Sequence, residues 1–144
     1  MEGIQALMFR KYKNLVINLM RKGMSPTEIA IAVSLGNFIG ILPFLGLHTV
    51  IALGAAYILR LNIAVVFLGT QISNPFSFPF ILFISAQIGN LVINGSLLTL
   101  RFTGDVEIVR EYIIPTLVGS LLLGLVVAIA SYPVTLRLAR RFRT

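Results

Sequence analysis

Apolar residues follow one another almost without interruption from residue 29 to residue 136. Three stretches, 29–59, 61–100 and 112–136, contain no Asp, Glu, Lys or Arg and are 31, 40 and 25 residues long. Helices of water-soluble proteins keep a polar face, which these stretches lack. The pattern therefore excludes a soluble globular domain and predicts helices that enter a membrane.

The first 24 residues follow a different pattern, one typical of an amphipathic helix. Apolar residues recur every three or four positions from Ile4 to Leu19, and basic residues occupy other positions. Gly23 is expected to end this helix. Two placements remain open, a helix lying in the membrane interface and a solvated arm packed on the other helices. We take residues 1–24 as a basic interfacial helix and residues 25–144 as a single polytopic membrane domain.

A second helix is predicted to begin at residue 26. Ser25 is suited to the N-cap, Pro26 to the first helical position and Glu28 to the third, which together make a capping box. Pro43 and Gly46 then predict a break near residues 42–47. The stretch is either one kinked span or a re-entrant hairpin of two half-helices, 26–41 and 47–59. Arg60 favours the hairpin, because it would then return to the cytoplasmic side.

The 40-residue stretch contains a second break, near residues 73–79. As one helix it would be about 60 Å long, twice the roughly 30 Å hydrocarbon core of a bilayer. Pro75 and Pro79 interrupt it, so a second hairpin followed by a crossing, or two crossings, is expected. Irregular backbone at membrane depth needs protein or water around it, so the break should face the interior. The expected fold is an all-α integral membrane protein with two broken or re-entrant helical hairpins and about two full transmembrane helices.

Basic residues gather at the two ends of the chain. Of 144 residues only 12% are charged, and the formal net charge is +7. Bases that flank apolar runs indicate the cytoplasmic side of a membrane and contact with anionic lipid headgroups rather than nucleic acid. The predicted location is the cytoplasmic (inner) membrane, multi-pass, with both termini cytoplasmic and residues 101–111 as an outer loop. The residues expected to meet headgroups are Arg10, Lys11, Lys13, Arg21, Lys22, Arg137, Arg140, Arg141 and Arg143.

Small residues recur at four-residue spacing in two places, at 32, 36 and 40 and at 120, 124 and 128. Such stripes let helix backbones approach closely in lipid. They favour a homo-oligomer. Polar side chains within the apolar stretches, among them Gln87, Asn90 and Asn94, are predicted to tie helices together.

Residues 29–93 resemble a bacterial membrane family, domain of unknown function 2062. The resemblance is carried by Gly-Asn-Phe-Ile-Gly-Ile-Leu-Pro-Phe-Leu-Gly-Leu-His at 36–48, Arg-Leu-Asn at 60–62, Ile-Ser-Asn-Pro at 72–75 and Ile-Gly at 88–89. It implies a small, polytopic bacterial membrane protein. The family often has Gln at the position of His48.

The two breaks are the candidate functional site. Asn74 could cap the half-helix that follows it or also help to bind an anion, because free N–H groups at a half-helix N-terminus attract negative charge. His48 could relay protons or bond to backbone carbonyls. The candidate substrate-binding residues are Pro43, Gly46, His48, Arg60, Asn62, Ser73, Asn74, Pro75 and Ser77. The leading functional hypothesis is transport or flipping of an anionic lipid or small solute, and the alternative is a non-transporting membrane scaffold or partner-recruiting protein.

Catalysis finds little support in the sequence. The apolar stretches contain no acid, and the chain has no Cys, one His, no His-Glu-x-x-His motif and no phosphate-binding loop. No catalytic residue, metal or cofactor is therefore expected. An enzyme acting on lipid-linked sugars would need an acid beside His48 or Asn74.

Overall fold

The computed structural model describes residues 2–44, 46–99 and 109–142, and every regular element in these ranges is helical. Most of the predicted outer loop and Arg143 lie outside the described residues. The elements are α1 (Glu2–Arg21), α2 (Pro26–Ile41), α3 (Leu47–Ile58), α4 (Ile63–Thr70), α5 (Phe78–Asn94), a π-helical turn η1 (Val109–Ile113) and α6 (Ile114–Arg141).

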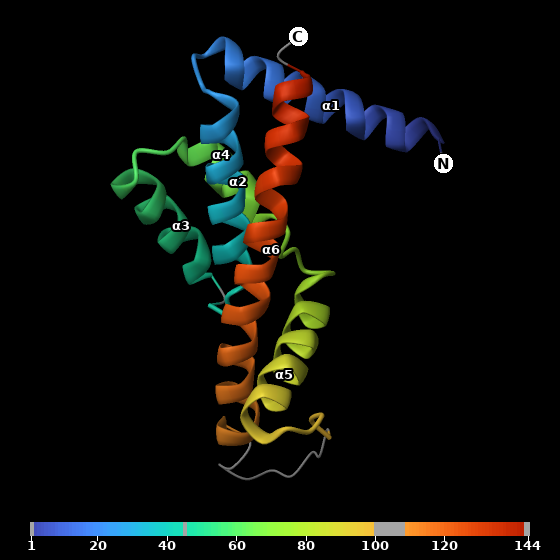
Figure 1. Ribbon diagram of the computed structural model, residues 1–144, viewed down its shortest axis with the longest axis vertical. Helices are drawn as coiled ribbons and strands as arrows, with labels where there is room; N and C mark the ends of the chain where they lie inside the picture. The colour runs from blue at the N-terminus through green and yellow to red at the C-terminus, as the bar shows by residue number, and fades with distance from the viewer. Residues whose placement is uncertain (1, 45, 100–108, 143–144) are drawn as a thin grey trace.

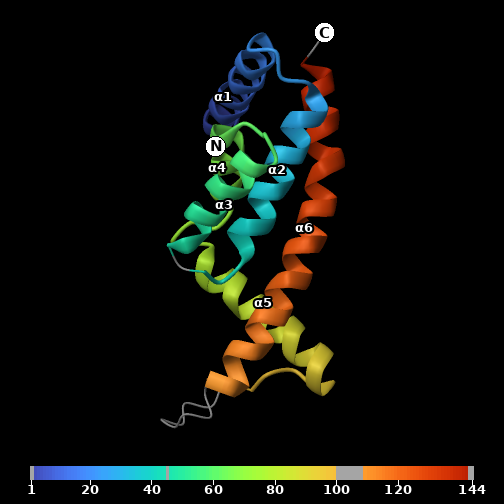
Figure 2. The same cartoon turned by 90° about the vertical axis from the view of Figure 1, so that its left-hand side faces the viewer.

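The longest helix, α6, is the spine on which the others are arranged (Figure 1). Its 28 residues make it about 42 Å long. From its middle toward its C-terminus it meets α2, where Phe38 lies against Gly124 and the Ser131 hydroxyl donates to the Ser34 hydroxyl at 3.2 Å. On its N-terminal half, α5 brings Gly89 against Pro115. Helices α2 and α5 therefore cover successive halves of α6, both antiparallel to it, as Figure 2 also shows.

The first break folds the chain back into a hairpin, as the position of Arg60 favoured. Helix α2 begins with the predicted capping box, in which Glu28 N donates to Ser25 Oγ at 3.2 Å and Ser25 N donates to Glu28 Oε2 at 2.8 Å. Gly46 has φ +78°, a conformation that suits glycine, and stands at the N-cap of α3. Helix α3 packs on α2 and α4 and returns toward the end of the molecule where α2 began.

The second break does not form a hairpin, so that part of the predicted fold is wrong. Helix α4 packs on α2 and α3, whereas α5 packs on α6. Helix α4 runs parallel to α2, since Gly36 meets Val66 and Gly40 meets Thr70. The chain thus continues in one direction through α4 and α5 (Figure 1). The physical reason is that α5 finds its own close contact on the lower part of α6, beyond the end of α2.

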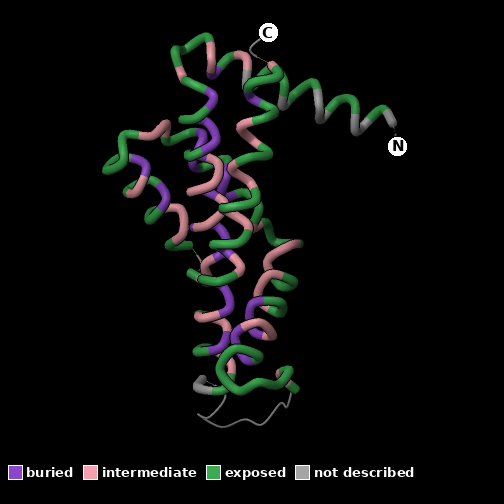
Figure 3. The backbone as a smooth tube through the Cα atoms, in the orientation of Figure 1, coloured by how far each residue is buried: buried purple, intermediate pink, exposed green. Residues whose placement is uncertain are grey.

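Glycines bring the helix backbones into direct contact. A Cβ added at Gly36 would overlap the carbonyl oxygen of Val66 and come within 2.8 Å of Gly69 Cα. A Cβ added at Gly119 would overlap the carbonyl oxygen of Ser85. The small-residue stripes that suggested an oligomer are therefore used inside the monomer, and Figure 3 shows buried positions along the axis where the helices meet.

The exterior is apolar over most of its length. Phe80, Val126 and Tyr57 expose 71%, 63% and 78% of their surface. Within the described residues one helical segment, Glu111–Arg141, is long and apolar enough to cross a membrane, and α2, α3 and α5 are shorter apolar helices.

Candidate functional site

The two breaks begin side by side. A Cβ added at Gly40, near the end of α2, would come within 2.8 Å of the carbonyl oxygen of Thr70, the last residue of α4, and within 3.3 Å of Ile72 Cγ2. Because α2 and α4 run parallel, the connections 42–46 and 71–77 leave from the same level of the molecule. The structure therefore brings the starts of the two predicted breaks together.

The second break is closed by its own side chains. Asn74 Oδ1 accepts from Phe76 N at 3.0 Å and from Ser77 N at 2.9 Å. Asn74 N donates to Ser77 Oγ at 3.0 Å, and Ser77 Oγ donates to the carbonyl oxygen of Ile72 at 2.6 Å. The N–H groups of the turn that leads into α5 therefore already have partners, which favours Asn74 as a residue that closes this turn.

This break faces outward, contrary to the expectation that it faces the interior. Phe76 is 88% exposed, and Asn74 and Pro75 are exposed as well. Every backbone N–H from Gln71 to Phe78 donates to a nearby oxygen, Pro75 having none. Because its donors are satisfied locally, the turn does not need surrounding protein to satisfy them.

The first break uses His48 in a similar way. His48 N donates to the carbonyl oxygen of Phe44 at 3.0 Å, and His48 Nδ1 lies 3.2 Å from the same oxygen. The ring is half-buried, and its partner is a carbonyl oxygen that also accepts from His48 N at the start of α3. This geometry gives the imidazole a structural partner.

Arg60 and Asn62 lie apart from the breaks. Helix α3 has 12 residues and is about 18 Å long. It runs away from the first break and carries Arg60 toward the end of the molecule where α2 begins. Asn62 Oδ1 accepts from Val65 N at 3.3 Å and caps α4. Arg60 therefore lies away from the two breaks, because α3 folds back.

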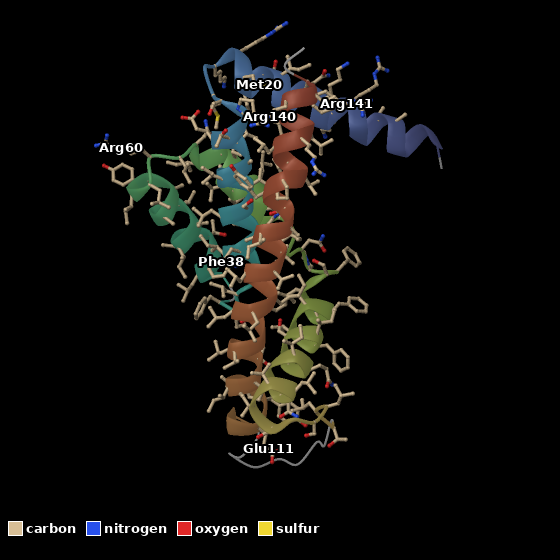
Figure 4. The ribbon with its side chains drawn as sticks, in the orientation of Figure 1. Met20, Phe38, Arg60, Glu111, Arg140 and Arg141 are labelled. Carbon is tan, nitrogen blue, oxygen red and sulfur yellow. The ribbon has the colours of Figure 1, made fainter. Side chains whose placement is uncertain are left out.

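Three arginines and one glutamate mark opposite ends of the molecule. Figure 4 shows Arg60, Arg140 and Arg141 at the same end as Met20, and Glu111 at the other end. Helix α1 extends sideways from the basic end (Figure 1). Its last turn carries the core residue Leu19, whereas Leu7 is 68% exposed. Between residues 6 and 15, every residue of α1 whose burial the structure describes is exposed.

A row of polar residues on α5 has a role that the sequence did not reveal. Gln87 Nε2 donates to the Leu98 carbonyl oxygen at 3.1 Å, and Leu98 N donates to Gln87 Oε1 at 2.9 Å. Asn90 Nδ2 donates to the Ser96 carbonyl oxygen at 2.7 Å, and Asn94 Nδ2 donates to Asn90 Oδ1 at 2.7 Å. These side chains hold residues 95–99 against their own helix instead of tying two helices. The spacing of these polar residues on one helical face could have indicated a shared role. The irregular segment 95–99 that they bind could not be predicted from the sequence.

No metal centre is apparent in the described ranges, where no three His, Asp or Glu side chains come together.

The comparison with known families is more informative. The model of a family described as uncharacterized protein conserved in bacteria, domain of unknown function 2062, matches residues 9–144. The chain belongs to this family. No curated protein and no solved structure matches the chain.

Several residues of the domain of unknown function 2062 pattern make contacts between helices or close turns. Gly36 and Gly40 contact α4, and Gly89 contacts α6. Asn62 caps α4, and Asn74 closes the turn before α5. Arg60 is different, because its side chain is exposed and its φ is +55°. A non-glycine residue rarely adopts this left-handed conformation, which costs roughly 1–2 kcal/mol. Glycine would suit this turn better than arginine. The turn therefore does not account for the presence of an arginine at position 60.

Proposed function

We propose that this chain is a multi-pass protein of the bacterial cytoplasmic membrane and that it serves as a non-transporting scaffold there. Its apolar exterior and its single basic end support the location. Helix α6, about 42 Å long, exceeds the roughly 30 Å hydrocarbon core. The α4–α5 path crosses in the opposite direction, and the α2–α3 hairpin enters from the basic end and returns to it. Positive charge at that end supports the proposal that it lies at the cytoplasmic face.

The amphipathic helix α1 is the proposed contact with the membrane surface. A 20-residue helix with little tertiary packing is marginally stable in water, and an anionic interface supplies both apolar and ionic partners. The bases proposed to contact headgroups are Arg10, Lys11, Lys13, Arg21, Lys22, Arg137, Arg140 and Arg141. The exposed Leu7 would insert among the lipids.

The scaffold role rests on one observation, the closed hydrogen bonding of the second break. Asn74 and Ser77 occupy the N–H groups of the turn before α5, which an anion bound at this turn would need. Beside the break, α2 and α4 meet backbone to backbone at Gly40. In this proposal the breaks are packing devices that shape a rigid unit, and the exposed surfaces recruit lipids and partners.

Cysteine labelling tests the topology directly, because the natural chain has no Cys. Single-cysteine variants Asn14→Cys, Ser96→Cys and Val126→Cys would be treated with a membrane-impermeant maleimide on intact cells lacking an outer membrane. We expect Ser96→Cys to react at once, Asn14→Cys to react after permeabilisation, and Val126→Cys to stay unlabelled. Labelling of Asn14→Cys and Ser96→Cys from the same side would overturn the topology.

Transport of an anionic lipid or small solute is the second candidate, because the two breaks begin side by side at Gly40 and Thr70. Reconstituted vesicles containing labelled anionic lipids or a solute panel separate the two roles. A scaffold moves nothing above empty vesicles. Movement by the natural chain that disappears in Asn74→Ala but persists in Asn74→Asp, with both variants folded, would favour transport.

A further inference from the structure

The second break lies beside the middle of the longest helix, α6. Phe38 of α2 packs on Gly124 of α6. Gly40, two positions further along α2, meets Thr70, which is the last residue before the break. Figures 1 and 2 both show the connection from α4 to α5 at about half the height of α6. The break is therefore far from both ends of the molecule.

The charged residues of α6 and the turn before it show how deep this level is. Gly124 is 13 positions from Glu111 and 13 positions from Arg137 in the apolar helical segment, which is about 20 Å in each direction. The hydrocarbon core of a bilayer is roughly 30 Å thick. In the proposed membrane location, the second break is therefore at the centre of the hydrocarbon core.

Two exposed amide side chains at the break have unused hydrogen-bonding groups. Asn74 Oδ1 accepts from two backbone N–H groups, which fixes the oxygen toward the turn and directs Nδ2 away from it. No acceptor for Asn74 Nδ2 is present in the part of the chain that the structure describes. Gln71 Nε2 reaches Thr70 Oγ1 at 3.5 Å, longer than an ordinary hydrogen bond, and Gln71 Oε1 has no donor within the described ranges.

These two amides need a polar partner at membrane depth. The backbone N–H groups of the turn are satisfied locally, but that does not satisfy the side chains of Gln71 and Asn74. Lipid chains offer neither donors nor acceptors, so an unpaired amide in the hydrocarbon core is costly. Phe76, which is 88% exposed, adds a large apolar surface on the same turn. A polar turn with an aromatic ring beside it suits contact with protein better than contact with lipid.

The two amides are complementary to each other, which selects a second copy of this chain as the partner. Asn74 has hydrogens left to donate, and Gln71, three positions earlier, has an oxygen left to accept. A two-fold axis at the turn would bring each donor to the acceptor of the other copy, so the same contact is made twice. Asparagine and glutamine side chains stabilise association in membranes through such bonds.

We propose that two copies of this chain form a two-fold dimer at the second break, in which Asn74 Nδ2 of each copy donates to Gln71 Oε1 of the other. The dimer presupposes the proposed membrane location. Labelling of Asn14→Cys and Ser96→Cys tests that location separately. A dimer that fails to form in a chain with the expected topology therefore counts against the dimer alone.

Energy transfer between two dyes measures the association. Copies of the full chain carrying donor or acceptor dye at Ser96→Cys are mixed in vesicles of phosphatidylethanolamine and phosphatidylglycerol and diluted with lipid. Gln71→Met removes the amide and keeps the length of the side chain. It should raise the protein-to-lipid ratio at half-maximal transfer by roughly tenfold or more, because both bonds of the symmetric contact are lost. Asn18→Leu, which removes an exposed amide from α1, should leave the ratio unchanged. Circular dichroism checks that both variants keep the fold.

Oxidative cross-linking locates the contact, because the natural chain has no Cys. Phe76→Cys should form a disulfide-linked dimer in the vesicles, whereas Val92→Cys, 60% exposed near the end of α5, should stay monomeric. Efficient cross-linking at Gly54→Cys in place of Phe76→Cys would put the contact on α3 and overturn the proposal. Reaction of Phe76→Cys with a membrane-impermeant maleimide would show that water covers the turn and would overturn it too. Equal association of Gln71→Met and the natural chain, or transfer no greater than random proximity gives, would also refute the dimer.

Discussion

The contact between α5 and α6 makes the sharpest prediction about stability. Gly89→Ala adds one methyl group at a point where the two backbones touch. The new Cβ would overlap the carbonyl oxygen of Pro115 and lie 2.9 Å from Gly119 N. Gly54→Ala makes the same chemical change in the middle of α3, where a Cβ meets nothing within 4 Å. The two substitutions should therefore have opposite effects.

The magnitudes follow from packing and from helix propensity. Neither overlapping atom is a flexible side chain, so α5 and α6 must separate, and overpacking of this kind costs about 1–3 kcal/mol. At Gly54 no clash offsets the helix propensity of alanine, which exceeds that of glycine by up to about 1 kcal/mol. The free energies of unfolding of the two variants should thus differ by roughly 2–4 kcal/mol.

Thermal unfolding in mild detergent, followed by far-ultraviolet circular dichroism, measures this difference. The chain has no Trp, so backbone signal is the suitable probe. Gly119→Ala, whose Cβ would overlap the carbonyl oxygen of Ser85, serves as an independent variant from the other side of the contact. The reasoning fails if Gly89→Ala unfolds at the temperature of the natural chain, or if Gly54→Ala is destabilised as much as Gly89→Ala.

Three further predictions concern the cap, the strained arginine and self-association. Asn74→Ala should destabilise the chain by about 1 kcal/mol in the same unfolding assay because it removes the acceptor for two N–H groups, whereas Asn74→Asp keeps that acceptor and should restore stability. Arg60→Gly should raise stability in detergent by about 1 kcal/mol by relieving a φ of +55°, yet it should lower the extra stability gained from anionic lipid; a loss in both media would contradict this. Gly54→Cys should form a disulfide-linked dimer in membranes if the open glycine of α3 meets a second copy, and efficient cross-linking at Val126→Cys instead would place the contact elsewhere.

Local signals in the sequence predicted the helix ends well. The capping box at Ser25 and Glu28 is present as expected, and Pro43 and Gly46 separate helices that end at Ile41 and begin at Leu47. Gly23 has φ +87° just after α1, which ends at Arg21. These features depend on residues within one or two turns of each other, so the order of residue types is sufficient to specify them.

The direction of the chain after each break could not be predicted in the same way. Both breaks contain proline and polar residues, yet the first reverses the chain and the second does not. The outcome depends on which glycine contact the next helix finds, and Gly89 meets Pro115 across 26 positions of sequence. The short helix α4 had a readable start, the cap Asn62, but its end at Thr70 is set by the parallel contact with α2.

The structural positions of the family pattern bear on where function lies. Gly36 and Gly89 let helix backbones touch, because neither residue has a side chain. The side chain of Asn74 is used to close a turn. Helix α2 packs on both α4 and α6, and the Gly89 contact packs α5 against the start of α6. Function in this chain is therefore expected at the two ends that this framework holds apart. Arg60, another member of the pattern, has an exposed side chain and lies at one of those ends (Figure 4).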